Sequence, residues 1–183
     1  MTLIYALETP FDAPALTFKI VGHQWYWNYQ NHDVVDPEFF PRHSNKFFMF
    51  DSYMKPQSEL KFGHRRLLEV DKPLLIPVET PLRMLVTSVD VIHSWAVPSL
   101  GLKMDAIPGR LNQFWLYAPF QGVFYGQCSE LCGANHGFMP INVYVVTPET
   151  YLKWYFKIAQ EGRDELAKKL AKLILSRHES KNL

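Results

Sequence analysis

The residues best suited to chemistry lie close together in one short stretch of the sequence. Residues 126–140 read GQCSELCGANHGFMP and hold two thiols, an imidazole, a thioether and a carboxylate, in Cys128, Cys132, His136, Met139 and Glu130. One further histidine, His93, stands upstream in the sequence DVIHSW. Thiolate and thioether donors combined with imidazole select copper, and two histidines, one cysteine and a weak methionine form blue-copper sites. The second cysteine indicates more than one copper ion.

This donor set meets the needs of two copper ions if both sulfurs bridge them. We predict Cys128 and Cys132 as bridges, His93 and His136 as terminal ligands, Met139 on one copper and the backbone carbonyl of Glu130 on the other. Bound metal would deprotonate both thiols, whose pKa is about 8.5 in free cysteine. A bridged pair shares one electron over two ions, so each metal–ligand bond changes little on reduction. Such a centre suits rapid electron transfer.

Zinc is the main alternative, because structural zinc sites also use two cysteines and two histidines. Three observations favour copper: methionine is not a zinc ligand, all donors but His93 lie in one loop, and the chain is large enough for a core of its own. Taken singly, Met139 would indicate core packing and His93 a hydrogen-bonded core residue. The remaining histidines have no such company and are expected to be structural or at the surface: His23, His32, His43, His64 and His178.

Composition limits the classes of protein to which this chain can belong. It has 183 residues, 19 Lys and Arg against 18 Asp and Glu, and a formal charge of +1. Nucleic-acid binding is not expected, because it calls for a basic patch and a pI above about 9. A domain of this size buries a core without a metal or a disulfide, so a metal site implies a function. A disulfide between Cys128 and Cys132 would close too short a loop to constrain the unfolded chain.

The elements that must position these donors are predicted to be β-strands. Aromatic residues make up 15% of the chain and there are 13 prolines, which favours strands and turns over a helical bundle. Short apolar and β-branched runs predict strands within residues 16–30, 60–70, 73–79, 82–97, 112–119, 122–127 and 139–146. Residues 31–50 contain Pro37 and Pro41 and are predicted to form a long inserted loop. Regularly spaced short strands indicate a mainly β fold, a sandwich or a Greek-key barrel.

One uncharged stretch, residues 111–129, is long enough to span a membrane. We reject a membrane helix there, because Asn112, Pro119 and several Gly and Gln residues would leave polar groups unsatisfied in lipid. Two short aromatic strands around a turn fit this stretch better. The N-terminal sequence MTLIYALETPFDAPA has no basic region followed by an apolar one, so no secretory signal is predicted.

The sequence changes character after Thr147. Thr147 can cap a helix, Pro148 suits its first turn, and Glu149 complements the positive end of the helix dipole. Apolar residues then recur at helical spacing: Leu152, Tyr155, Phe156, Ala159, Leu166, Leu170, Leu173 and Ile174. The chain is therefore divided into an N-terminal extension (1–15), a metal-binding β domain (16–147) and a C-terminal helical extension (148–183).

Charge is distributed unevenly between these parts. The C-terminal extension has eight Lys and Arg against five Asp and Glu, a charge of +3, which leaves −2 for residues 1–147. A helical tail that packs on its own core or on a neighbour is favoured over attachment to a membrane surface or nucleic acid.

Four stretches of the sequence resemble the copper-A domain of cytochrome c oxidase subunit II: GHQWYWNY (22–29), DSYM (51–54), RMLVTSVDVIHSWAVPSLGLKMDAIPGRLNQ (83–113) and YGQCSELCGANHGFMPI (125–141). The resemblance covers residues 16–147 and keeps the family's order of aromatic strand, distant histidine and copper loop. It implies a cupredoxin-like Greek-key β barrel with two copper ions in a dinuclear copper-A centre. It also implies an electron path from cytochrome c to haem in oxidase subunit I.

The resemblance further implies roles for single residues. Trp25 resembles the exposed aromatic residue at which electrons enter, whereas Trp27 is expected to pack a strand. Glu130 resembles the residue whose carbonyl binds copper while its carboxylate binds a magnesium ion shared with subunit I, and magnesium prefers such oxygen ligands. Asp51, Asp71 and Asp90 match acidic positions that dock basic cytochrome c, and Asp33, Asp36 and Glu38 could extend this patch. Such rim charges steer the encounter more than they add affinity.

Family members usually begin with a two-helix transmembrane hairpin, which the given sequence does not contain. If the chain is complete, we expect the hairpin either to be dispensed with or to be a separate chain, as happens where the subunit is split between two polypeptides. Residues 31–50 and the tail after Thr147 are longer than in the family, and the tail is expected to pack on other oxidase subunits. The expected location is the intermembrane-space side of the mitochondrial inner membrane, within a membrane complex, with the bacterial periplasmic face as the alternative.

The expected function is electron transfer within a haem-copper terminal oxidase. The complex is a respiratory-chain oxidoreductase, and this chain alone would perform no bond chemistry. The alternative is a copper-storing or copper-delivering β-domain protein without redox turnover. Such a protein would share the thiols and Met139 but would not need Trp25 or the Glu130 carboxylate.

Overall fold

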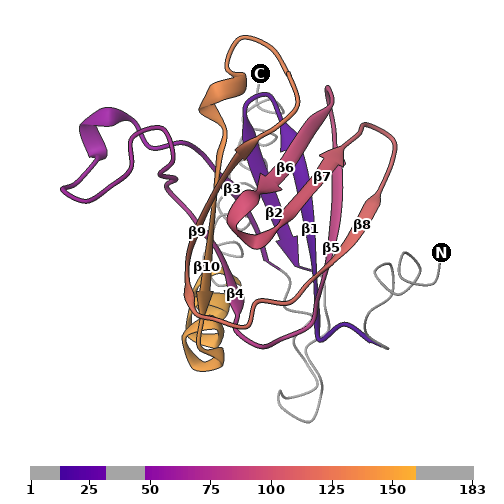
Figure 1. Ribbon diagram of the computed structural model, residues 1–183, viewed down its shortest axis with the longest axis vertical. Coiled ribbons are helices and arrows are strands. Elements are labelled where there is room, and N and C mark those ends of the chain that lie inside the picture. The colour runs from indigo at the N-terminus through magenta and orange to yellow at the C-terminus, as the bar shows by residue number, and fades with distance from the viewer. Residues whose placement is uncertain (1–12, 32–47, 160–183) are drawn as a thin grey trace, which may run out of the picture.

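A computed structural model describes residues 13–31 and 48–159 and folds them into two five-stranded β-sheets that pack against each other (Figure 1). The first sheet has the order β3 (Phe48–Ser52), β2 (Tyr26–Asn31), β1 (Leu16–His23), β5 (Leu82–Ser88) and β8 (Asn112–Leu116). The second has the order β4 (Leu74–Pro77), β10 (Pro140–Val146), β9 (Gly122–Cys128), β6 (His93–Val97) and β7 (Leu102–Ala106). Short 3-10 helices are η1 (Gln57–Glu59), η2 (Pro98–Leu100) and η3 (His136–Phe138). The prediction of a mainly β fold is confirmed.

Strand pairing is mixed in both sheets. β1 runs parallel to β5 and β4 runs parallel to β10, while the other neighbouring strands are antiparallel. A parallel pair cannot be joined by a tight hairpin, so other strands lie between its two members in the sequence. Several of these connections pass from one sheet to the other. One such passage leads from β8 to β9, so the two strands predicted within residues 111–129 exist but belong to different sheets. Within residues 13–31 and 48–159, no helix is both long enough and apolar enough to cross a membrane.

The core lies between the two sheets, because alternate side chains of each strand point inward. Every second residue of β5 is buried. Trp27 from the first sheet and Trp95 from the second are fully buried, and the Trp95 indole donates a hydrogen bond to the Tyr29 hydroxyl at 3.3 Å. Burying one large apolar side chain contributes roughly 1.5–3 kcal/mol to stability. The two sheets therefore share one aromatic-rich core that fixes their relative position.

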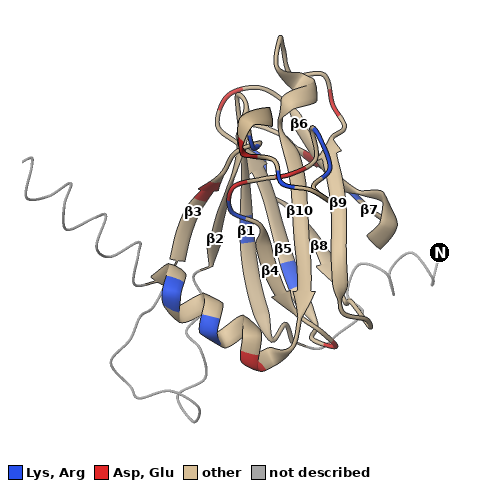
Figure 2. Ribbon diagram, turned by 90° about the vertical axis from the view of Figure 1, so that its left-hand side faces the viewer, with Lys and Arg blue, Asp and Glu red and all other residues tan. Residues whose placement is uncertain are grey.

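A helix begins at residue 148, as the sequence after Thr147 predicts, and its described part runs to residue 159. The Thr147 hydroxyl oxygen accepts a hydrogen bond from the Thr150 amide at 3.3 Å, which caps the first turn. Tyr155 is buried, with its ring centre 5.4 Å from that of Phe48. This part of the extension thus packs on the chain's own core, at the end of the sandwich opposite the loop between β9 and β10 (Figure 1). Figure 2 shows acidic and basic residues along the same helix.

Several expectations concern residues outside those that the structure describes. The N-terminal extension 1–15 is described only from residue 13, and the inserted loop 31–50 only at its ends, where Asn31 ends β2 and Phe48 begins β3. The C-terminal extension 148–183, which is expected to contact other oxidase subunits, is described only to residue 159. Further residues outside the described ranges are His32, Asp33, Asp36, Glu38, His43 and His178.

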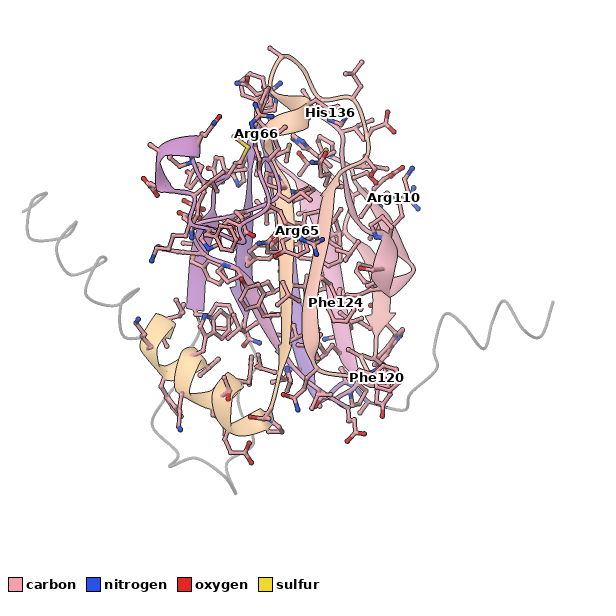
Figure 3. The ribbon with its side chains drawn as sticks, turned by 60° about the vertical axis from the view of Figure 1, so that its left-hand side comes forward. Arg65, Arg66, Arg110, Phe120, Phe124 and His136 are labelled. Atoms are coloured by element: carbon pink, nitrogen blue, oxygen red, sulfur yellow. The ribbon has the colours of Figure 1, made fainter. Side chains whose placement is uncertain are left out.

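The strand predicted within residues 60–70 is wrong. These residues form turns and a single β-bridge at Val70. The buried Glu69 carboxylate holds the segment in turns instead of a strand. It accepts hydrogen bonds from the Arg65 amide, within the segment, and from the Tyr125 hydroxyl of β9, both at 3.1 Å. The Arg65 guanidinium also lies 4.6 Å from the centre of the Tyr125 ring, so the segment covers β9 (Figure 3). The segment is therefore a loop that Glu69 and Arg65 attach to the second sheet.

Two edge strands, β3 and β7, are present although the sequence patterns do not predict them. β3 ends the segment that contains the prolines, and β7 has one fully buried side chain in five residues. Burial does alternate along β3, where Phe48 and Phe50 are buried and Met49 is exposed, but Met49 is itself apolar, so the sequence does not show the alternation.

Candidate metal centre

The predicted metal ligands gather at one end of the second sheet. His93 is the first residue of β6 and Cys128 is the last residue of β9, and these antiparallel strands are neighbours. Their register pairs Trp95 with Cys128, which brings His93 beside the start of the loop between β9 and β10. This loop contains the other donors, and η3 within it places His136 at the same end of the sandwich (Figure 3).

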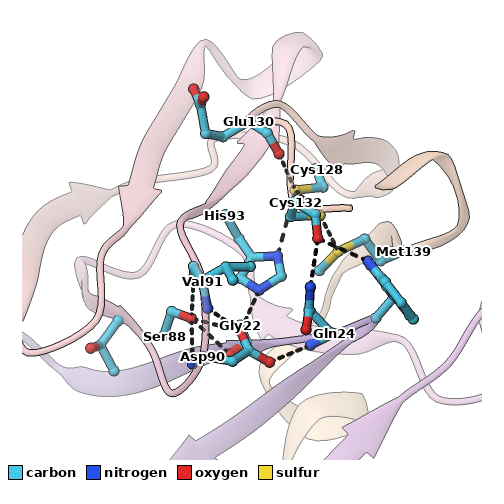
Figure 4. A network of polar contacts seen from close by, with 12 residues as sticks. Gly22, Gln24, Ser88, Asp90, Val91, His93, Cys128, Glu130, Cys132 and Met139 are labelled. Atoms are coloured by element: carbon cyan, nitrogen blue, oxygen red, sulfur yellow. Dashed lines mark hydrogen bonds and ion pairs between the residues drawn. The ribbon is translucent and has the colours of Figure 1, made fainter. Parts of the chain in front are cut away.

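Two sulfurs and two imidazole nitrogens form the centre of the cluster, and Figure 4 shows both cysteines with His93. The sulfurs of Cys128 and Cys132 are 3.9 Å apart. Nδ1 of His93 lies 4.0 Å from the Cys128 sulfur, and Nδ1 of His136 lies 3.5 Å from the Cys132 sulfur. Each sulfur therefore has one histidine beside it. Among the described residues, one group of three or more His, Cys, Asp or Glu side chains has all its donor atoms within 4.8 Å of one another. It consists of His93, Cys128 and Cys132.

The two remaining predicted donors flank this pair of sulfurs. The Met139 sulfur is 3.6 Å from the Cys132 sulfur, and the Glu130 carbonyl oxygen is 3.4 Å from the Cys128 sulfur. Two donors that bind one ion tetrahedrally at about 2.0–2.3 Å stand roughly 3.5 Å apart. The observed separations and the soft character of the donors therefore fit a pair of copper ions. Met139 lies beside the Cys132 sulfur and the Glu130 carbonyl beside the Cys128 sulfur.

The two thiols differ in the direction in which the protein shifts their pKa. Burial opposes ionisation of Cys128, but hydrogen bonds from His93 and from the backbone outweigh it and lower the pKa of this thiol. The pKa of Cys132 is raised, first by burial and then by the negative charge of Cys128. Burial likewise opposes protonation of His93, yet its contacts with Cys128 and Asp90 raise its pKa. The site alone favours one thiolate over two, so a bound cation is needed to keep both sulfurs ionised.

The loop is fastened to the first sheet by two tryptophans. The Trp27 indole donates a hydrogen bond to the Met139 carbonyl at 3.2 Å, and its ring centre lies 5.9 Å from that of His93. Trp25 Nε1 donates to the Cys132 carbonyl at 3.1 Å. Gly133 has a φ of +113°, and a Cβ there would lie 3.1 Å from the Trp25 ring. Glycine therefore allows both the turn and the close approach of the indole.

Gln24 joins the site although the sequence gives no signal for it. Its side-chain amide donates to the Cys132 carbonyl at 2.9 Å, on the same oxygen that Trp25 contacts. The turn between β1 and β2 thus touches a predicted bridging ligand through two neighbouring side chains. An exposed glutamine in a turn is common, and only the packing of the sheets gives it this partner.

The three aspartates predicted to dock a basic partner lie in different settings. Asp51 accepts a hydrogen bond from the Asn28 side chain at 2.7 Å, and Asp71 accepts one from the Tyr53 amide at 2.8 Å. Asp90 lies instead against the metal centre, with Oδ1 2.8 Å from Nε2 of His93. Asp90 is nevertheless exposed, with 30% of its side chain accessible, so its docking role stays a prediction.

An aromatic stack that sequence reasoning misses lies beside Asp51. The rings of His23 and Tyr26 stack with centres 4.5 Å apart, and those of Tyr26 and Tyr53 are 4.6 Å apart. Burial and the negative charge of Asp51 raise the pKa of Tyr53 to about 12, so its hydroxyl stays neutral. Tyr53 is 44% exposed, which makes this stack part of the outer surface.

Glu130 has its carbonyl at the cysteines and is itself exposed. Among the described residues, no metal-binding group of His, Cys, Asp and Glu includes its carboxylate. The magnesium site therefore stays a prediction that would need ligands from another subunit.

The fold and the site together define a class of protein. Two sheets of mixed pairing that gather histidine, cysteine and methionine donors in the loop before the last strand form a cupredoxin-like copper domain. The family model described as "Cytochrome C oxidase subunit II, periplasmic domain" matches residues 16–146. The chain therefore belongs to the cytochrome c oxidase subunit II family, whose members bind copper at the copper-A centre.

Individual relatives agree with this assignment. Cytochrome c oxidase subunit 2 of Cyanidium caldarium is 52% identical over 152 residues, which are 83% of this chain and 57% of that protein. The Branchiostoma floridae protein of the same name is 54% identical over 154 residues, which are 84% of this chain and 62% of that protein. A mitochondrial relative from Vigna unguiculata is 50% identical over 153 residues, 84% of this chain and 39% of that protein. The chain thus spans about three fifths or less of these relatives.

Solved structures of subunit II domains are also similar to this chain. The periplasmic domain of subunit II of cytochrome oxidase (CoxB) of Bradyrhizobium japonicum has a TM-score of 0.69 and 43% identity, covering 82% of this chain and 97% of that one. A mixed disulfide intermediate between thioredoxin-like TlpAs and subunit II of cytochrome c oxidase has a TM-score of 0.66 and 41% identity, covering 85% and 99%. The prediction of a cupredoxin-like fold is confirmed.

Proposed function

We propose that this chain is the electron-transfer part of a haem-copper terminal oxidase. It accepts electrons from cytochrome c at a dinuclear copper-A centre and passes them to haem in subunit I. The observation that carries the proposal is the convergence of all six predicted donors at one end of the second sheet, in direct contact with Trp25.

The ligand assignment follows from the donor geometry. Cys128 and Cys132 would bridge two copper ions, with His93 and His136 as terminal ligands. Met139 and the Glu130 carbonyl would complete one ion each. The bound pair supplies one-electron redox chemistry, and the residues around it decide how electrons reach it and how little the site reorganises. Loop anchoring by Trp27 and the close packing of the buried His93 both support a site that keeps its geometry.

Trp25 is proposed as the residue at which electrons enter. Its indole is half-buried, so one edge remains available to a partner while Nε1 binds the Cys132 carbonyl at 3.1 Å. This hydrogen bond gives a short covalent and hydrogen-bonded connection from the surface to a bridging sulfur. A copper-storing protein has no need of such a connection, which favours the electron-transfer function.

The partner that approaches Trp25 is proposed to be basic cytochrome c. Asp51 and Asp71 support this, together with the exposed Tyr53 of the aromatic stack. Acidic groups around an aromatic contact steer a basic protein and set the salt dependence of association.

The remaining partners follow from the family. Subunit I would receive the electron and share a magnesium ion with the Glu130 carboxylate. Other oxidase subunits would contact the C-terminal extension, residues 148–183. We place the chain on the intermembrane-space side of the mitochondrial inner membrane, in line with its mitochondrial relative, with the bacterial periplasmic face as the alternative.

The experiment that tests the proposed function is reduction of the copper-loaded chain by reduced cytochrome c, followed by stopped flow. Trp25→Phe removes the indole N–H and its bond to the Cys132 carbonyl, so electron transfer should slow strongly while both copper ions stay bound. Trp115→Phe on β8 is the matched control and should react like the parent chain. An unchanged rate for Trp25→Phe would instead favour a copper-storing protein.

A further inference from the structure

The Asp90 carboxylate is used inside the chain in a way that a docking charge does not require. Its Oδ1 is 2.8 Å from Nε2 of His93, and its Oδ2 accepts a hydrogen bond from the Gln24 amide at 2.6 Å (Figure 4). Oδ1 also accepts hydrogen bonds from the Val91 amide at 2.6 Å and the Ser88 hydroxyl at 3.2 Å. Both oxygens of this carboxylate therefore serve groups of the chain itself.

These contacts determine which nitrogen of His93 can bind a metal. A carboxylate only accepts hydrogen bonds, so Nε2 carries the hydrogen and Nδ1 keeps its lone pair. Nδ1 faces the Cys128 sulfur at 4.0 Å, and the ring is fully buried. A carboxylate on the far nitrogen fixes the orientation of a ligand histidine and makes it a stronger donor to the metal.

Through Gln24 the same carboxylate also reaches the second cysteine. The Gln24 backbone amide binds Asp90, and its side-chain amide binds the Cys132 carbonyl at 2.9 Å. Gln24 lies in the turn between two strands of the first sheet, whereas His93 begins a strand of the second. Asp90 thus connects two predicted ligands by way of the opposite sheet.

We propose that Asp90, acting together with Gln24, is a positioning residue of the metal centre that holds His93 and Cys132 in one arrangement for copper. This rests on the proposed function, because it takes the cluster to bind copper. Asp51 and Asp71, whose described hydrogen bonds go to Asn28, Tyr53 and Lys72, keep the docking role.

An Asp90→Asn substitution separates the two roles. The amide has one accepting oxygen and a donating NH2 group, while the position faces four donors, from His93, Gln24, Val91 and Ser88. One of these donors must lose its partner. Loss of partners of this kind lowers metal affinity by roughly 10- to 100-fold. Loss of the carboxylate charge also weakens donation from His93, so the reduction potential should rise.

The test uses the full chain and measures copper affinity by chelator competition, together with paramagnetic resonance and reduction potential. Asp90→Asn should bind copper roughly 10- to 100-fold more weakly and show an altered spectrum and a higher potential. The matched control is Asp105→Asn, which makes the same change at a carboxylate that accepts a hydrogen bond from Ser94, beside His93, at 2.8 Å. One amide oxygen can accept that bond, so the control should resemble the parent chain.

A second variant covers the case in which Asp90→Asn does not fold, as judged by thermal unfolding. Gln24→Leu keeps the backbone amide on Asp90 but removes the side-chain contact with Cys132, so it should still alter the copper spectrum. Parent-like affinity, spectrum and potential in every folded variant of Asp90 and Gln24 would overturn the inference. If the parent chain itself binds no copper pair, the proposed function fails, whereas normal variants of a parent that binds the pair defeat only this inference.

Discussion

Replacing Gly22 by alanine tests whether His93 is held in place by close packing. A Cβ at Gly22 would lie 2.8, 3.1 and 3.2 Å from Cδ2, Cγ and Cβ of His93, whereas carbon atoms pack at about 3.5–4.0 Å. The ring is fully buried, so it must shift by roughly 0.5–1 Å against its neighbours. Overpacking of this kind costs about 1–3 kcal/mol. For a chain of this length, that lowers the Tm by roughly 2–12 °C.

The assay is thermal unfolding of the full chain, together with copper binding at a temperature where both proteins are folded. Gly137→Ala is the matched control in the metal loop, because a Cβ there would have no other atom within 4 Å. We expect Gly22→Ala to unfold at lower temperature and to bind copper more weakly, while Gly137→Ala is as stable as the parent chain or slightly more so. A parent-like Tm and copper affinity for Gly22→Ala would refute the packing argument.

Other predictions concern the ligands, the docking charges and the helix. Cys132→Ser should abolish the dinuclear centre, whereas Met139→Leu should retain copper with a shifted reduction potential, because axial ligands tune a site more than they hold it. Equal copper loss from both variants in metal analysis would mean that this ranking of the two ligands is wrong. Neutralising Asp51 and Asp71 together should flatten the ionic-strength dependence of cytochrome c oxidation, and an unchanged slope would place docking elsewhere. Thr147→Ala removes the helix cap and should cost about 1 kcal/mol in denaturant unfolding; no change in midpoint would mean that the cap is dispensable.

The metal loop could be predicted from sequence because its donors are neighbours in the chain. Five of the six donors lie between Cys128 and Met139, so a short loop must bring them together whatever the fold. Most strands were predictable for a related reason, since alternation of buried and exposed residues is written along each strand, as in β5. The helix start was also readable, because Thr147 and the residues after it carry a local capping signal.

Contacts that depend on packing between the sheets could not be predicted in this way. Gln24 meets Cys132, and Gly22 lies under His93, only because the first sheet packs against the second. Asp90 and His93 are three residues apart, so their contact had a local signal in the sequence, which the ligand prediction did not use. The segment 60–70 shows the converse, because its apolar residues suggested a strand, whereas the charged side chains of Arg65 and Glu69 hold it as a loop on Tyr125 of β9.

The central claim is that Cys128 and Cys132 bridge two copper ions that share one electron. Paramagnetic resonance of the full chain loaded with copper and partly oxidised tests this most directly. We predict two coppers per chain and a hyperfine pattern produced by one electron spread over two copper nuclei. A pattern from a single copper nucleus, or a chain that retains zinc and takes up no coloured copper, would contradict the claim.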